Sequence, residues 1–174
     1  MPLFPTTDAD LPAIVALVNS AYRGDSARQG WAHEADYLSG QRTDEASLRA
    51  SLAAQAEARL LVWRDEPDGN ALGCVFLEPA EGSTWYLGML TVRPDLQARR
   101  LGRDLLQAGE DFAAAQGADR IRMTVVNVRG TLIAWYQRRG YALTGERRPF
   151  PYDDARFGLP QRDDLSFVVL EKMI

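Results

Sequence analysis

The sequence predicts an α/β (α+β) fold in which helices cover a mixed β-sheet. One observation is the order of elements: two helical patterns come first, then three apolar strands, then strands and helices in alternation. The second is composition, because 46% hydrophobic and 25% charged residues are typical of an ordinary globular protein. The third is length, since 174 residues without a linker or repeat indicate a single domain over residues 1–174.

The N-terminal part of the chain reads as two helices separated by a polar loop. Apolar residues recur at helical spacing from residue 11 to residue 22. The stretch 24–40 is polar, rich in turn residues and longer than most connections, so we predict a loop there. Thr43 is expected to cap a second helix that continues to about Glu57.

The rest of the chain predicts strands with two more helices between them. Strands rich in aliphatic and aromatic residues are expected at 59–64, 71–77, 85–92, 121–125 and 165–170, with one more strand between the last two. A long amphipathic helix is expected from about Arg99 to Gly117, and a short one from about Thr131 to Gly140; each glycine is placed to end its helix.

Charge and composition exclude several functions. A net charge of −4 argues against general affinity for nucleic acid or an anionic membrane surface. The one cysteine, Cys74, cannot form an internal disulfide, and a single histidine is too few for a histidine metal site, so no metal is expected. No apolar run approaches the ~18 residues of a membrane span, and we expect a cytoplasmic protein without membrane attachment.

One strand–turn–helix segment carries the strongest functional signal. Its strand ends in Leu90, Val92 and Pro94, and Gln97 and Gly102 follow at the start of the long helix. The free N–H groups of a helix N-terminus bind phosphates. With Gln97 and Gly102 at this spacing, the segment resembles the acetyl-CoA motif of the GCN5-related N-acetyltransferases, the GNAT family. The sequence departs from this motif at Arg100, which stands where the first motif glycine belongs.

A second block strengthens the resemblance. Ala134, Tyr136, Gly140 and Tyr141 match the family's pattern of a tyrosine, three residues, a glycine and an aromatic residue. The family often has an asparagine seven residues before this tyrosine; Arg129 stands there instead, and Asn127 lies two residues earlier.

The resemblance implies a mostly antiparallel sheet of six to seven strands flanked by about four helices. It implies acetyl-CoA as co-substrate and a direct transfer of the acetyl group to a primary amine of a small molecule or peptide; because dimers are common in the family, a homodimer is one assembly it implies. The implied cofactor-binding residues are those of the two motif blocks: Leu90, Thr91, Val92, Gln97, Ala98, Arg99, Arg100, Leu101, Gly102, Arg103, Asn127 and Arg129.

The resemblance also assigns two chemical roles. A backbone N–H of Leu90 to Val92 would stabilise the oxyanion of the tetrahedral intermediate. Tyr136 would donate a proton to the departing CoA sulfur. Read without the motif, Tyr136 is a packed aromatic on a helix face.

The acceptor side is predicted from the loop after the first helix, because this region covers the acceptor in the family. Trp31, Glu34 and Tyr37 are our candidate substrate-binding residues, as an aromatic-walled pocket with acids suits a cationic amine. Glu34, His33 and Asp36 are the candidates for the proton acceptor. The paired Asp153 and Asp154 could add negative charge on an opposite wall; each of these acids is also consistent with a solvated loop or turn.

Two alternatives from other classes remain. A non-catalytic acyl-CoA-binding or regulatory module is suggested by Arg100 and Arg129 at motif positions. A nucleotide-binding protein could use Arg99, Arg100 and Gly102 at a helix start. The sequence lacks the phosphate-loop and dinucleotide motifs, which disfavours the second alternative.

Overall fold

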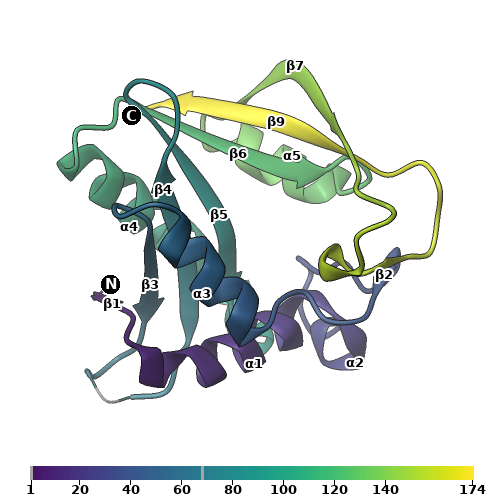
Figure 1. The fold of residues 1–174 in the computed structure, drawn as a ribbon, viewed down its shortest axis with the longest axis horizontal. Coiled ribbons are helices and arrows are strands. Elements are labelled where there is room, and N and C mark those ends of the chain that lie inside the picture. The colour runs from purple at the N-terminus through teal and green to yellow at the C-terminus, as the bar shows by residue number, and fades with distance from the viewer. Residues whose placement is uncertain (1, 68) are drawn as a thin grey trace.

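The computed structural model describes residues 2–67 and 69–174, with only the backbone at residues 98 and 99. Its seven-stranded sheet has the order β1-β3-β4-β5-β6-β9-β7 (Figure 1). Among the described strands, β5 and β6 form the parallel pair and the other neighbours are antiparallel. The predicted mixed, mostly antiparallel sheet of six to seven strands is confirmed. The strands are β1 (Leu3–Pro5), β3 (Arg59–Trp63), β4 (Gly73–Pro79), β5 (Thr84–Val92), β6 (Arg120–Val126), β7 (Ala142–Pro149) and β9 (Ser166–Met173).

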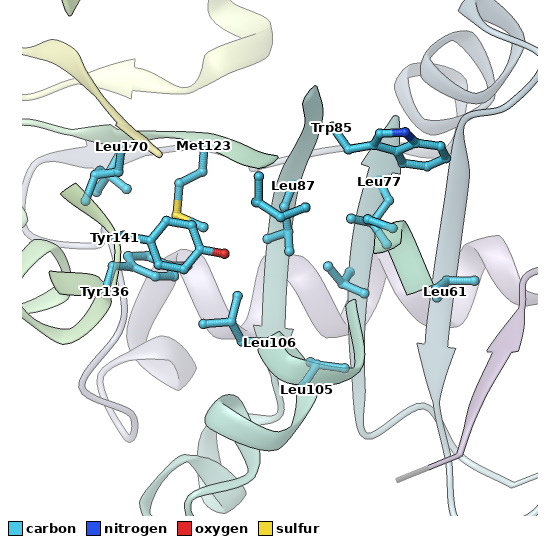
Figure 2. Close-up of a cluster of buried hydrophobic side chains, with 14 of the residues drawn as sticks. Leu61, Leu77, Trp85, Leu87, Leu105, Leu106, Met123, Tyr136, Tyr141 and Leu170 are labelled. Carbon is cyan, nitrogen blue, oxygen red and sulfur yellow. The ribbon is translucent and has the colours of Figure 1, made fainter. Parts of the chain in front are cut away.

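Helices cover both faces of this sheet. The helices are α1 (Leu11–Tyr22), α2 (Gly24–Ala27), α3 (Glu45–Ala54), α4 (Leu101–Ala115) and α5 (Gly130–Gln137). Helices α1 and α3 pack on one face with Cys74 and Phe76, and α4 and α5 pack on the other with Leu87 and Met123 (Figures 1 and 2). None of the described helices is long and apolar enough to cross a membrane.

Short elements account for most differences from the sequence prediction. Strand β1 and the two-residue strands β2 (Leu38–Ser39) and β8 (Leu159–Pro160) were not predicted. Such short strands exist only through their distant partners, β3 for β1 and each other for β2 and β8, and local periodicity cannot reveal them. Helix α3 is capped by Asp44 rather than Thr43, because the Asp44 carboxylate accepts the Ser47 N–H at 2.7 Å.

A buried network holds α4, the end of β9 and Tyr141 together. The Glu110 carboxylate accepts hydrogen bonds from the Tyr141 hydroxyl at 2.8 Å and from the Lys172 ammonium at 2.6 Å. Tyr141 in turn packs edge-on against Tyr136, with ring centroids 5.6 Å apart (Figure 2). Through Tyr141, this network of paired polar groups fixes the position of the Tyr136 ring.

The sheet opens between β5 and β6. These strands pair only from Thr84–Tyr86 with Arg120–Arg122, at their N-terminal ends. On its other edge β5 stays paired with β4, but the register shifts between Cys74 and Phe76, and Met89 has φ +50° at the bulge. The C-terminal half of β5 therefore diverges from β6 and leaves one edge of its backbone free for other partners.

Candidate active site

A cleft of about 630 Å³ follows the free edge of β5 where it parts from β6. Its lining combines both sequence blocks with the loop after α1: Tyr22, Trp31, Leu90, Thr91, Val92, Gln97, Arg100, Gly102, Arg103, Arg129, Leu132, Trp135, Tyr136 and Arg139, with Ala21 and Ala32. Nine of the sequence-predicted cofactor or catalytic residues thus share one cavity with the predicted Trp31.

The backbone of β5 presents N–H groups to this cleft. The Leu90 carbonyl accepts a hydrogen bond from the Tyr22 hydroxyl at 3.1 Å, and the Val92 carbonyl accepts one from the Gln97 amide at 3.2 Å. Both carbonyls therefore face away from β4. In an extended strand the N–H and C=O of one residue point to the same side, so the N–H groups of Leu90 and Val92 face the cleft as well.

The Gln97 side chain ties the wall of the cleft together. Its oxygen accepts the backbone N–H groups of Trp31 at 3.1 Å and Ala32 at 3.3 Å, while its nitrogen donates to Val92. Packing is tight enough that a Cβ on Gly30 would lie 2.3 Å from the Gln97 oxygen. The side chain of this motif residue positions the loop that carries Trp31 rather than pointing freely into the cleft.

The start of α4 forms the floor of the cleft. Arg100, at the position of the first motif glycine, has φ +64° and ψ 1°, the left-handed conformation for which glycine is favoured. Its exposed side chain lines the cleft together with Arg103. A Cβ on Gly102 would make only ordinary contacts, 3.7 Å from Trp135 and 4.0 Å from Val92, so the missing side chain leaves space in the cleft. The side chains of Ala98 and Arg99 lie outside the described residues.

Tyr136 is buried between the cleft and the core. Its ring packs edge-on against Trp135, with centroids 5.0 Å apart, and against Tyr141. Its hydroxyl makes no hydrogen bond to any described residue, and Tyr136 lines both the cleft and the cavity behind it. Burial raises the pKa of this phenol above its ordinary value, so the hydroxyl is fully protonated at neutral pH.

Four of the predicted site residues do not line this cleft. Asn127 uses its side chain to join β6 to β9, donating to the Asp164 carbonyl and accepting from the Ser166 N–H. Leu101 packs against the core beneath α4. The Tyr37 hydroxyl donates to the His33 carbonyl at 3.3 Å, and Glu34 is enclosed by arginines.

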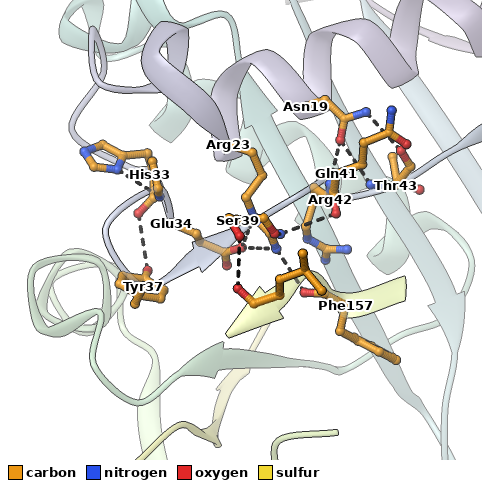
Figure 3. Close-up of polar contacts among 12 residues, drawn as sticks. Asn19, Arg23, His33, Glu34, Tyr37, Ser39, Gln41, Arg42, Thr43 and Phe157 are labelled. Carbon is orange, nitrogen blue, oxygen red and sulfur yellow. Dashed lines mark hydrogen bonds and ion pairs between the residues drawn. The ribbon is translucent and has the colours of Figure 1, made fainter. Parts of the chain in front are cut away.

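Glu34 is the centre of a buried ion cluster. Its two carboxylate oxygens bind Arg23 at 2.8 Å and Arg129 at 3.1 Å, and all three side chains are less than a tenth exposed. Arg23 also donates to the carbonyls of Ser39 and Phe157, which joins the β2 segment to the β8 segment (Figure 3). Burial opposes ionisation of Glu34, but the arginines outweigh it and hold the carboxyl pKa below its usual range.

The other predicted acids and His33 do not line the cleft either. The Asp36 carboxylate pairs with Arg28, and the His33 ring nitrogen Nδ1 accepts the Ala35 N–H at 3.3 Å. Asp154 pairs with Arg156 at 2.5 Å. Among the described residues, no group of three His, Cys, Asp or Glu side chains is placed to hold a metal ion.

Three further cavities lie on the far side of Tyr22, and the first of them adjoins the cleft. The first shares Tyr22, Leu90 and Tyr136 with the cleft, and it leads past Tyr86 to two larger cavities of about 1000 and 840 Å³. Arg42 and Tyr86 line all three. We refer to these three cavities together as the acceptor-side cavities.

Tyr86 and Gly88 shape the passage between these cavities. A Cβ on Gly88 would lie 2.7 Å from the Tyr86 ring, so this glycine lets the ring lie flat along β5. The Tyr86 hydroxyl then reaches Thr124 on β6 at 3.1 Å. It therefore bridges the two strands beyond the point where their backbone pairing ends.

Sequence reasoning missed Arg42, Glu78 and Trp135. Glu78 lines the largest acceptor-side cavity, makes no hydrogen bond or ion pair with a described residue, and has its pKa raised by burial. The only sequence signal for Glu78 is an acid at the end of an apolar strand. Trp135 has the Arg139 guanidinium 3.5 Å above its ring, a pair four residues apart on one helix.

Comparison with known proteins agrees with this geometry. The model of the family described as "Acetyltransferase (GNAT) family" matches residues 17–141, which include the whole cleft. The chain belongs to this GNAT acetyltransferase family. It is 31% identical over 83 residues to a mycothiol acetyltransferase of Beutenbergia cavernae, a match that covers 47% of this chain and 28% of that protein. The chain thus spans little more than a quarter of the length of this curated relative.

Solved structures share the GNAT fold over more of the chain. A putative phosphinothricin N-acetyltransferase superposes with a TM-score of 0.72 at 17% identity, covering 99% of this chain and 97% of that one. A GNAT acetyltransferase from Elizabethkingia anophelis with acetyl-CoA bound gives a TM-score of 0.57 at 15% identity, covering 73% of this chain and 81% of that one. At these identities the likeness establishes the fold.

The backbone at Arg100 generates a stability prediction. We expect Arg100→Gly to be more stable than Arg100→Ala by about 1 kcal/mol, because a left-handed residue costs a non-glycine roughly that much. Urea unfolding of the two variants measures the difference. Arg103, inside α4, is the matched control: there alanine should be the more stable by about 1 kcal/mol. Equal stability of the two Arg100 variants would contradict the prediction.

Proposed function

We propose that this protein is an acetyl-CoA-dependent N-acetyltransferase that transfers the acetyl group directly to a primary amine of a small molecule or peptide. The observation that carries the proposal is the shared cleft at the parted edge of β5. It brings the N–H groups of Leu90 and Val92, the Tyr136 hydroxyl and the start of α4 to one cavity.

The residues of the cleft fit acetyl-CoA. The first N–H groups of α4 have no partners within the helix, and together with Arg100 and Arg103 they suit the pyrophosphate. The space above Gly102, between Trp135 and Val92, accommodates the chain that leads to the thioester. When bound, acetyl-CoA supplies a thioester whose carbonyl carbon accepts an amine.

The parted strand supplies the oxyanion stabilisation that this reaction needs. As the amine nitrogen bonds to the carbonyl carbon, negative charge collects on the carbonyl oxygen. An N–H of Leu90 or Val92, fixed by the β4–β5 pairing, donates to that oxygen without reorganising. The same free edge holds the extended co-substrate alongside the strand.

Tyr136 is the proposed general acid. When the carbon–sulfur bond breaks, the CoA sulfur takes a proton from the Tyr136 hydroxyl, which has no competing partner among the described residues. The proton lost by the amine balances the proton gained by sulfur, and exchange with solvent returns Tyr136 to its neutral form. Because burial raises its pKa, Tyr136 keeps its proton throughout the neutral range.

Glu78 is the proposed proton acceptor for the amine. It replaces Glu34, whose carboxylate is held by two arginines, and the candidates His33 and Asp36, which line neither the cleft nor the acceptor-side cavities. Glu78 lies directly across from Tyr86 in the β4–β5 register and faces the same cavity. Burial raises its pKa toward neutrality, which strengthens a carboxylate as a base.

The Gly102→Val variant tests the cofactor assignment. The added Cβ would make only ordinary contacts with Trp135 and Val92, and the two methyl groups beyond it would enter the cleft, so acetyl-CoA affinity should fall at least tenfold without loss of fold. Isothermal calorimetry measures affinity and circular dichroism measures the fold. Ala114→Val adds a similar side chain to the exposed face of α4 and should leave affinity unchanged. Unchanged affinity in Gly102→Val would remove the assignment.

Replacing Tyr136 with phenylalanine tests the acid. Tyr136→Phe should lower kcat by about 10²-fold or more and leave acetyl-CoA affinity nearly unchanged, since only the proton donor is lost. Tyr152→Phe is the control: that hydroxyl accepts the Leu165 N–H, far from the cleft lining. A full rate in Tyr136→Phe would assign the ring to packing. Tight acetyl-CoA binding by the native protein with no turnover on any amine would favour the non-catalytic binding module.

The pH dependence of kcat/KM tests Glu78. Its raised pKa means that the carboxylate is lost as pH falls through a value above the usual 4.5, so the native rate should fall below this ionisation in addition to the fall from protonation of the amine. The pH profile of Glu78→Gln should lack the fall caused by this ionisation, and the variant should be slower across the neutral range. Glu81→Gln, in the exposed turn after β4, should keep the native profile. An unchanged profile in Glu78→Gln would exclude Glu78 as the base.

A further inference from the structure

The acceptor-side cavities are electropositive although the whole chain carries a net charge of −4. Five arginines line them against two glutamates, and this set is Arg23, Arg42, Arg129, Arg148 and Arg156 with Glu34 and Glu78. Glu146 and Asp154, which pair with Arg148 and Arg156, reduce this excess to one positive charge, which favours a ligand that carries an anionic group. The electrostatics thus differ from the acidic, amine-binding wall that the loop sequence suggests.

Four of the five arginines already have acidic partners. Arg23 and Arg129 bind the two oxygens of Glu34. Arg148 pairs with Glu146 at 2.8 Å and Arg156 with Asp154. The Arg42 guanidinium makes no hydrogen bond or ion pair with any described residue, although its charge helps to lower the pKa of Glu34. It is the cation on this side that is free to bind a ligand.

Arg42 is held in place for such a contact. The Asn19 side-chain oxygen accepts the backbone N–H of Arg42 at 2.7 Å and that of Thr43 at 3.1 Å, and the Asn19 amide donates to the Thr43 carbonyl at 2.9 Å. The guanidinium lies 5.5 Å from the centre of the Tyr22 ring, a cation–π contact that leaves its N–H donors available. A planar guanidinium that extends from a fixed backbone and lies over an aromatic ring is suited to bidentate binding of a carboxylate.

Glu78 lines the same large cavity as Arg42 and is likewise without an ionic partner among the described residues. The rest of that cavity includes the apolar side chains of Leu48, Phe76 and Phe157. One unpaired cation and one unpaired anion in a partly apolar cavity complement a small molecule that carries both an ammonium and a carboxylate group.

We propose that the acceptor is a small amino acid-like molecule, a primary amine that also carries a carboxylate, and that Arg42 binds this carboxylate. The proposal rests on the proposed N-acetyltransferase function and specifies its substrate class. Arg42 contributes binding and selectivity: it anchors the carboxylate while the amine points toward the parted edge of β5. No bond of the substrate changes at Arg42.

The experiment compares the twenty common amino acids as free acids with their amides, under saturating acetyl-CoA. The amide removes the negative charge with little change in shape, and it also makes the amine less basic, which by itself favours the amide at neutral pH. We expect the best free acid to have a kcat/KM about 10- to 100-fold above that of its amide, the range of a charge-assisted hydrogen-bonded pair.

The variant Arg42→Gln should lower kcat/KM for that acid by a similar factor, mainly through KM, and leave the amide unchanged. Arg49→Gln is the matched control, because Arg49 lies on α3 outside these cavities and pairs with Asp8. The proposal would be overturned if the amides had the same kcat/KM as the acids, or if the Arg42→Gln enzyme still preferred the acid.

A binding measurement separates failure of this proposal from failure of the transferase function. Calorimetry with CoA present compares 3-phenylpropanoate, which lacks the amine, with its amide, 3-phenylpropanamide. We expect the native protein to bind the acid at least tenfold more tightly and Arg42→Gln to lose this preference. If no amine is acetylated but the preference is seen, the transferase function fails while the carboxylate site stands; equal binding of acid and amide would refute the carboxylate site itself.

Discussion

The separation of β5 from β6 is the constraint on which the rest of the site depends. A strand inside a sheet uses both edges of its backbone, and here one edge of β5 is released after Tyr86 while the other remains bound to β4. The released edge is rigid because of its bound partner and polar because of its free N–H groups. Tyr22 and Gln97 bind its carbonyls, so only the donors remain available. An extended ligand with an oxygen acceptor is complementary to such an edge.

The buried charges determine how the two sides of Tyr22 differ. Glu34 cannot act as a free carboxylate because two arginines enclose it, and its main contribution is to join the end of α1, the loop before β2 and the start of α5. Removal of Glu34 alone would leave two buried guanidinium groups without a counter-ion, which is usually far more costly than loss of a surface pair. The acceptor-side cavities inherit their positive character from this cluster and from Arg42.

The sequence predicted the parts of the site that are close together along the chain. Spacing of Leu90, Val92, Gln97 and Gly102 follows from the local geometry of a strand, a turn and a helix, and the structure places these residues around one cleft. Arg100 has the left-handed backbone conformation that is typical of glycine. The residue type alone does not reveal this conformation.

The acceptor side depends on contacts between distant segments. Arg23 reaches the Phe157 carbonyl across 134 positions, and the charge of Glu34 is decided by partners far away in the sequence. Isolated acids in a loop give no sign of such pairing. Acidic composition therefore predicted a wall for cations, whereas the folded chain has an arginine without an acidic partner among the described residues, Arg42, on that side.

The C-terminal segment lines one side of the site and not the other. Among the described residues, those beyond Arg139 contribute to the acceptor-side cavities, through Arg148, Phe157 and Phe167, and none contributes to the cleft along β5. Substitutions in the segment 148–167 can therefore change the shape and charge of the acceptor-side cavities without touching the lining of the cleft along β5. Under the proposed function, this division gives evolution, or directed mutagenesis, a region in which selectivity can change while the chemical step is preserved.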